Sequence, residues 1–338
     1  MKPSNLPIKS FVQAIRSVVV GAQTRTVASV NQELLLTYWQ IGRIITQKEK
    51  EQDWSSRQLI LALSKQLTKE LGRGFSRSNL SNMRVLYQLY PDVQTLSGQL
   101  GWSHWCELLS ISDEYKRAFY KKEAENAGWS VRELKRQIKS SLFERLLLSK
   151  GDLNKETVLK LSKEGQIIRH PSDLIKEPYV LEFLGIPEYK PLLEKDLERK
   201  LIRQIEFFLL ELGKGFMFVG SQQRVSIGNN HHYVDMVFYN KILRSYVLID
   251  LKMGKFVPAH AGQMNAYLNY YKTEINEDID NDPIGIILCT DKDEIVAEYA
   301  LGGLNNQIFA SKYIYYLPDK DALIQQVQRA ITSYDEEE

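Results

Sequence analysis

Charged residues interrupt two apolar stretches in the C-terminal half of the sequence. Asp235 lies within the run Tyr233–Tyr239, and Asp250 and Lys252 lie within the run Val247–Lys252. An ionised carboxylate in a largely buried strand is costly unless it is paired or bound to a metal. Because side chains alternate between the two faces of a strand, Asp250 and Lys252 share a face. These three residues are therefore candidates for a chemical site.

The two carboxylates indicate a divalent cation. If their strands pair as consecutive antiparallel neighbours, Asp235 and Asp250 converge, and like charges in such positions repel unless a cation lies between them. Mg²⁺ is bound by one or two carboxylates together with waters and phosphate oxygens, and we expect Mg²⁺ here, with Mn²⁺ as a possible substitute. Lys252 then points at the same pocket, where it can orient a water or stabilise charge that develops on a phosphate.

Helices on either side of these strands offer further polar residues. Glu198 shares a helical face with apolar residues, so its carboxylate is expected to pack against the sheet. Glu206 and Glu211 lie off that face and are expected to face solvent. In the helix that follows, Gln263 and Tyr267 are four residues apart and share a face, so both are expected to reach the metal or the scissile phosphate.

The elements that must position these residues form an α/β arrangement in the C-terminal half. Runs with strand-like composition alternate with helical patterns, which describes a mixed sheet flanked by helices. The expected elements are helices over 191–212, 258–271 and 294–300 and strands over 216–227, 232–239, 245–251, 283–289 and 312–317. Before them, residues 151–190 contain several Gly and Pro breakers and are expected to be a linker with short helices.

The N-terminal half, residues 1–150, is expected to be an all-α domain, so the fold class is α+β. Apolar residues recur at three- and four-residue spacing over 11–47. A second helix, a glycine turn over 72–75 and a third helix over 76–90 follow. Ser55 and Ser130 each precede Gln or Glu by three residues, which is the pattern of a capping box at a helix start.

Charge is distributed unevenly between the halves. The 338 residues include 44 Lys+Arg and 42 Asp+Glu, but residues 1–150 hold 23 of the basic and 13 of the acidic residues. A basic domain suits a polyanion such as nucleic acid, although solvated helices are also often Lys-rich. A helical hairpin that only packs or oligomerises would fit the pattern equally well. The residues expected to face outward and contact nucleic acid are Arg73, Arg77, Asn79, Asn82 and Arg84.

Several classes of protein are excluded by composition. No stretch approaches the ~18 apolar residues of a membrane helix, and the first ten residues do not have the pattern of a secretory signal, so we expect a cytoplasmic protein without a membrane partner. Cys106 and Cys289 are isolated, which disfavours a disulfide scaffold or a zinc cluster. His231 and His232 are adjacent in a strand and therefore form a poor chelating pair.

The spacing of the candidate residues resembles a known nuclease superfamily. Glu198, Asp235, Asp250-Leu251-Lys252 and Gln263-x-x-x-Tyr267 are similar to the pattern of PD-(D/E)XK nucleases. More closely, residues 207–220 and 250–256 resemble the YhcG-like bacterial nuclease family. The N-terminal half is matched by 74–76, 79–80, 102–104, 117–120 and 128–130, so the likeness spans nearly the whole chain.

The resemblance implies a restriction-endonuclease-like α/β sandwich that hydrolyses phosphodiester bonds of DNA with Mg²⁺. It implies an N-terminal domain that binds DNA or mediates assembly, and a homo-oligomer. The family usually has Glu at position 250, where this sequence has Asp250, whose side chain is shorter by one methylene. A DNA-binding or assembly module with an inactive nuclease fold remains an alternative. The implied metal-binding residues are Asp235, Asp250, Glu198 and Leu251.

Overall fold

The computed structural model describes residues 8–52, 55–96, 98–150, 153–186 and 193–337. The chain divides into two compact units, Met1–Lys135 and Arg136–Glu338, which are described separately. Residues 136–150 therefore pack with the second unit. Within the described residues, no helix is both long enough and apolar enough to cross a membrane.

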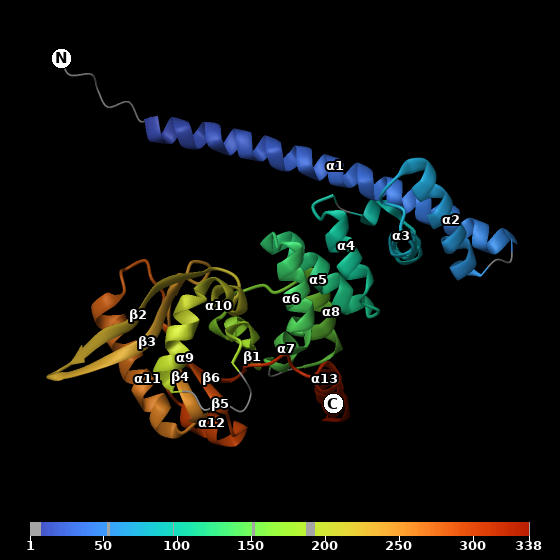
Figure 1. The fold of residues 1–338 in the computed structure, drawn as a ribbon. Coiled ribbons are helices and arrows are strands. Elements are labelled where there is room, and N and C mark those ends of the chain that lie inside the picture. Colours follow the sequence, from blue (N-terminus) through green and yellow to red (C-terminus); the bar gives the residue numbers. More distant parts are fainter. Residues whose placement is uncertain (1–7, 53–54, 97, 151–152, 187–192, 338) are drawn as a thin grey trace, which may run out of the picture. The chain divides into compact units, whose positions relative to one another are not determined.

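The N-terminal unit is helical throughout its described residues, as the sequence predicts (Figure 1). Its helices are α1 (Ile8–Gln52), α2 (Ser56–Leu71), α3 (Arg77–Leu89), η1 (Val93–Thr95), α4 (Trp102–Leu109) and α5 (Glu114–Ala127), and α6 (Val131–Lys139) crosses into the second unit. Gly42 lets α1 approach α3 closely, because a Cβ at this position would lie 2.0 Å from the carbonyl oxygen of Met83.

The capping box predicted at Ser130 forms completely, whereas at Ser55 only the bond to the N-cap side chain forms. The backbone N–H of Gln58 donates to Ser55 Oγ at 3.4 Å, at the start of α2. At the start of α6, the N–H of Ser130 donates to Glu133 Oε2 at 2.6 Å and the N–H of Glu133 donates to Ser130 Oγ at 3.3 Å. These contacts satisfy N–H groups that have no partner inside the helix, so the local sequence fixes where each helix begins.

In the C-terminal unit, the described residues form a six-stranded mixed sheet with the order β1-β6-β5-β4-β3-β2. β2, β3 and β4 are antiparallel neighbours, whereas β4, β5, β6 and β1 are parallel. The strands are β1 (Tyr179–Val180), β2 (Phe216–Ile227), β3 (Asn230–Asn240), β4 (Ser245–Lys255), β5 (Ile284–Asp291) and β6 (Gln307–Ile314). The central strands are buried on both faces, which is why their sequences are nearly continuous apolar runs.

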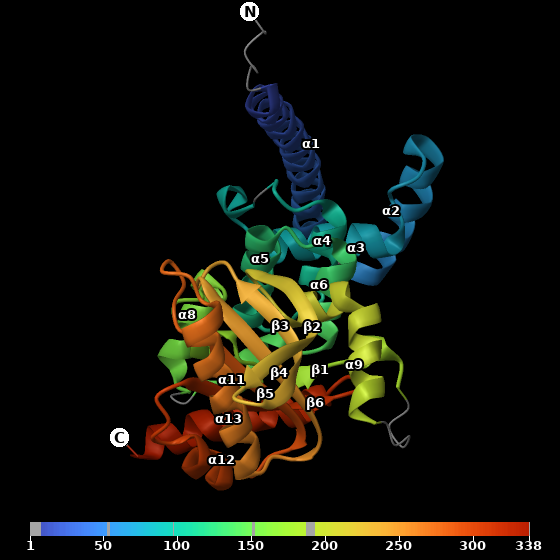
Figure 2. The same ribbon diagram turned by 90° about the vertical axis from the view of Figure 1, so that its left-hand side faces the viewer.

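Helices cover both faces of this sheet. Leu197, Leu201 and Phe208 pack with Met236 on one face, and Met264 packs with core residues on the other. Figure 2 shows the helices on both sides of the sheet. The helices of this unit are α7 (Leu142–Leu148), α8 (Lys155–Glu164), η2 (Pro171–Leu174), η3 (Glu182–Leu184), α9 (Glu194–Arg203), α10 (Ile205–Leu212), α11 (Pro258–Tyr270), η4 (Tyr271–Ile275), α12 (Glu294–Leu301) and α13 (Lys320–Glu337). The predicted sandwich of a mixed sheet between helices is confirmed.

Three details differ from the sequence prediction. The single helix predicted over 191–212 is broken at Gln204, where φ is −119° and ψ is 35°, into α9 and α10. The last strand, β6, begins at Gln307 and ends at Ile314, earlier than the predicted 312–317. Neither β1 nor α13 was predicted. β1 lies within the segment predicted as a linker, and it adds to the edge of the sheet beside β6.

Candidate active site

Asp235 and Asp250 meet at the point where β3 and β4 stop pairing. The ladder between these strands ends at Met236 opposite Ile249, so Asp235 and Asp250 are the next pair outward. There, Asp235 Oδ2 accepts a hydrogen bond from the backbone N–H of Leu251 at 2.8 Å. Asp250 is only 2% exposed. The structure therefore has the antiparallel arrangement that was predicted to bring these carboxylates together.

Lys252 is paired with the second of these carboxylates. Its Nζ lies 2.7 Å from Asp250 Oδ2, and its side chain is 14% exposed. Burial opposes the charged form of the lysine, but the charges of Asp250 and of Glu194 outweigh it and raise the pKa of Lys252 above its ordinary value. Lys252 is therefore an ammonium group at neutral pH, held at the edge of the site.

Glu198 is connected to Asp235 by Gln222, a residue that the sequence does not mark as functional. Glu198 is 7% exposed on α9. The side-chain amide of Gln222 on β2 donates to Glu198 Oε2 at 2.9 Å and to Asp235 Oδ1 at 3.2 Å. Gln222 has φ of +49°, a value that is uncommon for residues other than glycine. A polar residue in an exposed part of a strand gives no signal for this role.

Gln263 and Tyr267 on α11 contact each other, as their spacing predicts. Gln263 Nε2 donates to Tyr267 Oη at 2.6 Å, and Tyr267 is 2% exposed. Burial raises the pKa of Tyr267; the hydrogen bond from Gln263 lowers it, and the charge of Asp250 raises it. The charges of Asp250, Lys252 and Asp235 all act on the Tyr267 hydroxyl, so this residue lies within electrostatic range of the carboxylates.

The carboxylates occupy surroundings that disfavour negative charge. Burial, followed by the charge of Asp250, raises the pKa of Asp235 to about 7. Burial also raises the pKa of Asp250, in spite of Lys252, and burial and then Asp235 raise the pKa of Glu198. A bound cation would reverse these effects, because it favours the ionised form of each oxygen ligand.

The residues present fit a Mg²⁺ ion held by few protein ligands. Within the described ranges, no group of three or more Asp, Glu, His or Cys side chains could hold a metal ion. Mg²⁺ does not need such a cage, because it is usually bound by one or two carboxylates and keeps waters or substrate oxygens as its other ligands. Asp235 and Asp250 match that donor set. The Leu251 side chain is apolar and buried, so only its backbone carbonyl could contribute a ligand.

His231 and His232 do not form a pair. His231 contacts Arg224 and Ser226, whereas the ring centroid of His232 lies 6.2 Å from that of Tyr267. The two histidines therefore face different surroundings, as expected for adjacent residues in a strand.

The residues expected to bind nucleic acid differ in their surroundings. Arg73 and Arg77 are exposed, at the turn before α3 and at its start. Arg84 instead forms an ion pair with Glu49 at 3.2 Å. Asn79 Oδ1 accepts a hydrogen bond from Trp102 Nε1 at 2.6 Å, and Asn82 hydrogen-bonds to the Cys106 side chain. Among these five residues, Arg73 and Arg77 are the two for which the described part of the chain shows no contact of this kind.

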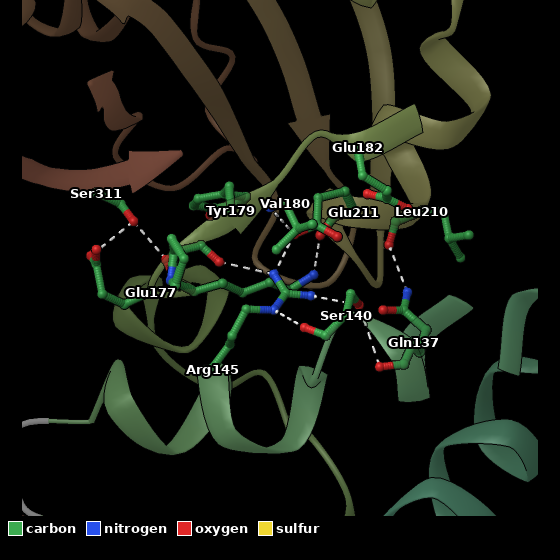
Figure 3. Close-up of polar contacts among 12 residues, drawn as sticks. Gln137, Ser140, Arg145, Glu177, Tyr179, Val180, Glu182, Leu210, Glu211 and Ser311 are labelled. Atoms are coloured by element: carbon green, nitrogen blue, oxygen red, sulfur yellow. Dashed lines mark hydrogen bonds and ion pairs between the residues drawn. The ribbon is translucent and has the colours of Figure 1, made fainter. Parts of the chain in front are cut away.

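The prediction that Glu211 faces solvent is wrong. Glu211 is fully buried, at 0% exposure, and forms an ion pair with Arg145 (Figure 3). It also forms an ion pair with Arg136, at 3.2 Å. The N–H of Val180 in β1 also donates to Glu211 Oε1 at 3.0 Å. Burial would raise the pKa of Glu211, but Arg145, Lys176 and Arg136 lower it to about 2.

The C-terminal unit is a nuclease domain of the PDDEXK class, as its match to known families shows. Residues 172–329 match the family model for the YhcG PDDEXK nuclease domain, and residues 14–145 match the DUF1016 N-terminal domain. The chain is 39% identical over 350 residues to "Putative nuclease YhcG" of Escherichia coli K12, and the match covers 92% of this chain and 91% of that relative. The chain belongs to the YhcG nuclease family.

Two solved structures are similar over a smaller part of the chain. A repair endonuclease from Pyrococcus abyssi is 18% identical with a TM-score of 0.27, covering 37% of this chain and 50% of that one. An EndoMS complex with double-stranded DNA is 14% identical with a TM-score of 0.27, covering 40% of this chain and 51% of that one. The chain therefore spans about half of each of these structures.

Proposed function

We propose that the C-terminal unit hydrolyses phosphodiester bonds of DNA with Mg²⁺, for which Mn²⁺ can substitute. The observation that carries this proposal is the convergence of Asp235 and Asp250 beside Lys252. Two carboxylates in a buried position are unfavourable without a cation. Asp235 and Asp250 would hold the metal, with Glu198 and the backbone of Leu251 as further ligands at the rim of the site.

Each residue has a role that follows from its position. A bound Mg²⁺ ion would neutralise phosphate charge and lower the pKa of a coordinated water. Lys252 is charged and held next to Asp250, where it can orient the attacking water or stabilise negative charge on the phosphate. Gln263 and Tyr267 are hydrogen-bonded to each other, and we propose that they contact the phosphate from the α11 side.

Glu198 would act as a further metal ligand next to Asp235. Burial and the charge of Asp235 raise its pKa in the metal-free protein, and a bound cation would favour its ionised form. Gln222 donates a hydrogen bond to both carboxylates and so orients Glu198 relative to Asp235.

We also propose that the N-terminal unit binds nucleic acid through Arg73 and Arg77 or assembles copies of the chain into a homo-oligomer. The excess of basic residues over residues 1–150 supports the first role. In this arrangement, one unit retains the substrate and the other cleaves it.

The decisive experiment is incubation of the purified protein with duplex, branched and single-stranded DNA, in Mg²⁺ and in EDTA. Cleavage in Mg²⁺ that is absent in EDTA supports the proposal. Binding without cleavage in either Mg²⁺ or Mn²⁺ would instead favour an inactive DNA-binding or assembly module. A protein with Lys252→Ala serves as the control for contaminating nuclease, because it contains the same preparation background without the charged group.

A further inference from the structure

The hairpin formed by β2 and β3 contains no acidic residue over its outer part. Between Glu211 and Asp235 the sequence has no Asp or Glu. The side chains of Arg224, His231 and Tyr233 are exposed there. The hairpin also extends past the point where β3 stops pairing with β4 at Met236, so its outer part is a ribbon of two strands only (Figure 1).

The two faces of this ribbon differ in character. Arg224 is paired with Tyr233, and Ser226 with His231, so these four side chains lie on one face. Contacts confirm this arrangement, because Arg224 Nη2 lies 2.7 Å from His231 Nε2 and Ser226 Oγ lies 3.1 Å from His231 Nδ1. The opposite face carries Val225 and Val234, which are fully buried in a core cluster that includes residues of α11.

The polar face leads directly into the candidate active site. We define it as Gln222, Arg224, Ser226, His231 and Tyr233. At its inner end, Gln222 donates to both Glu198 and Asp235. From Gln222 to the turn at Ile227, five residues at about 3.3 Å each span roughly 17 Å, which is about five base pairs of DNA at about 3.4 Å per step.

We propose that this polar face lies in the major groove of a DNA duplex, next to the scissile phosphate. The inference rests on the proposed nuclease function and specifies its substrate as double-stranded DNA. The major groove of B-DNA is about 12 Å wide and admits a two-stranded β-ribbon. The corresponding groove of an RNA duplex is too narrow and deep, and a single strand has no groove.

The chemistry of the face suits this position. Arg224 can donate two hydrogen bonds to a guanine edge or bind a phosphate, and Tyr233 and Ser226 add donors and acceptors. The absence of carboxylates removes repulsion from the phosphates on both walls of the groove. Because Val225 and Val234 of the other face pack in the core cluster with α11, the ribbon is anchored in one orientation, in which the polar face is exposed to a ligand.

The test compares full-length proteins by fluorescence anisotropy in EDTA, so that binding is measured without cleavage. The probes are a 20-base-pair DNA duplex, the RNA duplex of the same sequence and the single DNA strand. The test variant is Arg224→Ala combined with His231→Ala. The control is Lys241→Ala, which removes an exposed cation at the opposite end of β3. Thermal melting confirms that each variant is folded.

We expect the double variant to bind duplex DNA about tenfold or more weakly, because it loses side-chain contacts to base edges and phosphates in the groove. Lys241→Ala should bind as the wild type does, and the wild type should prefer the DNA duplex to the RNA duplex. An equal loss on all three probes, or no loss on any, would overturn the inference.

A second measurement identifies the groove without any substitution. Duplex DNA in which cytosines carry glucosylated hydroxymethyl groups has a filled major groove, and we expect the wild type to bind it at least tenfold more weakly. A small molecule that fills the minor groove of the unmodified duplex should leave the binding of the wild-type protein unchanged. The reverse pattern would reject the major-groove position.

Hairpin-dependent binding without metal-dependent cleavage would contradict only the nuclease proposal, whereas cleavage that is unaffected by the double variant would contradict only this inference.

Discussion

The carboxylate of Asp235 accepts a hydrogen bond from the backbone N–H of Leu251, which lies on the neighbouring strand. This contact fixes the first carboxylate relative to the second, because Leu251 directly follows Asp250. The orientation of Asp235 is thus set by the backbone and does not depend on a metal. A neutral side chain of the same shape could keep this hydrogen bond and lose only the charge.

Asp235→Asn should therefore weaken Mg²⁺ binding while the fold remains intact or becomes more stable. We expect at least a tenfold loss of Mg²⁺ affinity, because one of two charged ligands is removed. Calorimetric titration of Mg²⁺ into both proteins measures this. Equal affinities would show that Asp235 does not bind the metal.

The stability of the metal-free protein should decrease as the pH rises from about 4 to about 7. The pKa of Asp235 is raised to about 7 in the folded state, above its ordinary 3.8, so the folded protein binds more protons than the unfolded chain in that range. Thermal melting in EDTA at pH 5.5 and pH 8 should show a lower Tm at pH 8. Mg²⁺ should raise the Tm more at pH 8 than at pH 5.5, and Asp235→Asn should flatten the dependence of the Tm on pH. A Tm that rises with pH would contradict this.

Lys252→Ala should reduce the cleavage rate about 10²–10³-fold, which is the usual cost of losing one electrostatic contact to the transition state. DNA affinity should stay nearly unchanged, because many other phosphate contacts remain. Lys255→Ala is the matched control, since Lys255 lies on the same strand but is half exposed and forms its ion pair with Asp293. If Lys252→Ala and wild type cleave at the same rate, the catalytic site lies elsewhere.

Gln222 should act as a positioning residue. Gln222→Gly keeps the positive φ at low cost and removes only the amide that joins Glu198 to Asp235. We expect kcat to fall about tenfold and the Mg²⁺ concentration for half-maximal rate to rise, as is typical when a group that orients metal ligands is lost. A stable variant with an unchanged Mg²⁺ requirement would show that the contact has no functional role.

The arginines of the N-terminal unit should separate into two groups. Arg73→Ala with Arg77→Ala should weaken DNA binding and reduce its salt slope by about two, or about one per lost phosphate contact. Arg84→Ala should instead lower the Tm, because Glu49 loses its partner. DNA binding that survives the double change, together with a mass in solution above that of one chain, would favour an assembly role.

The sequence predicts the central part of the site because charge inside an apolar strand is a strong local signal. Asp235, Asp250 and Lys252 each interrupt such a run, and their strands are consecutive, so the antiparallel pairing follows directly. The bounds of β2 agree with the prediction for a similar reason, since it is a long strand-like run with a glycine directly before it and directly after it.

Features that arise where the regular periodicity of a helix or strand is interrupted could not be predicted in this way. Glu211 was assigned to solvent by extending one helical period through residues 191–212, but the break at Gln204 resets the phase of α10 relative to α9. Gln222 depends on an unusual backbone angle, which no residue type at that position indicates. β1 has two residues, too few to show any periodicity.

The ion pairs of Glu211 bear on how this gene could be divided or recombined. The nuclease-family match begins at residue 172, yet two of the three cations that lower the pKa of Glu211, Arg136 and Arg145, lie before that residue. A transplanted coding segment that started at residue 172 would keep Lys176 but lose both ion pairs of Glu211, and breaking a buried ion pair costs about 3–5 kcal/mol. The portable unit of this enzyme therefore begins at Arg136 or earlier, upstream of the boundary that family similarity alone marks out.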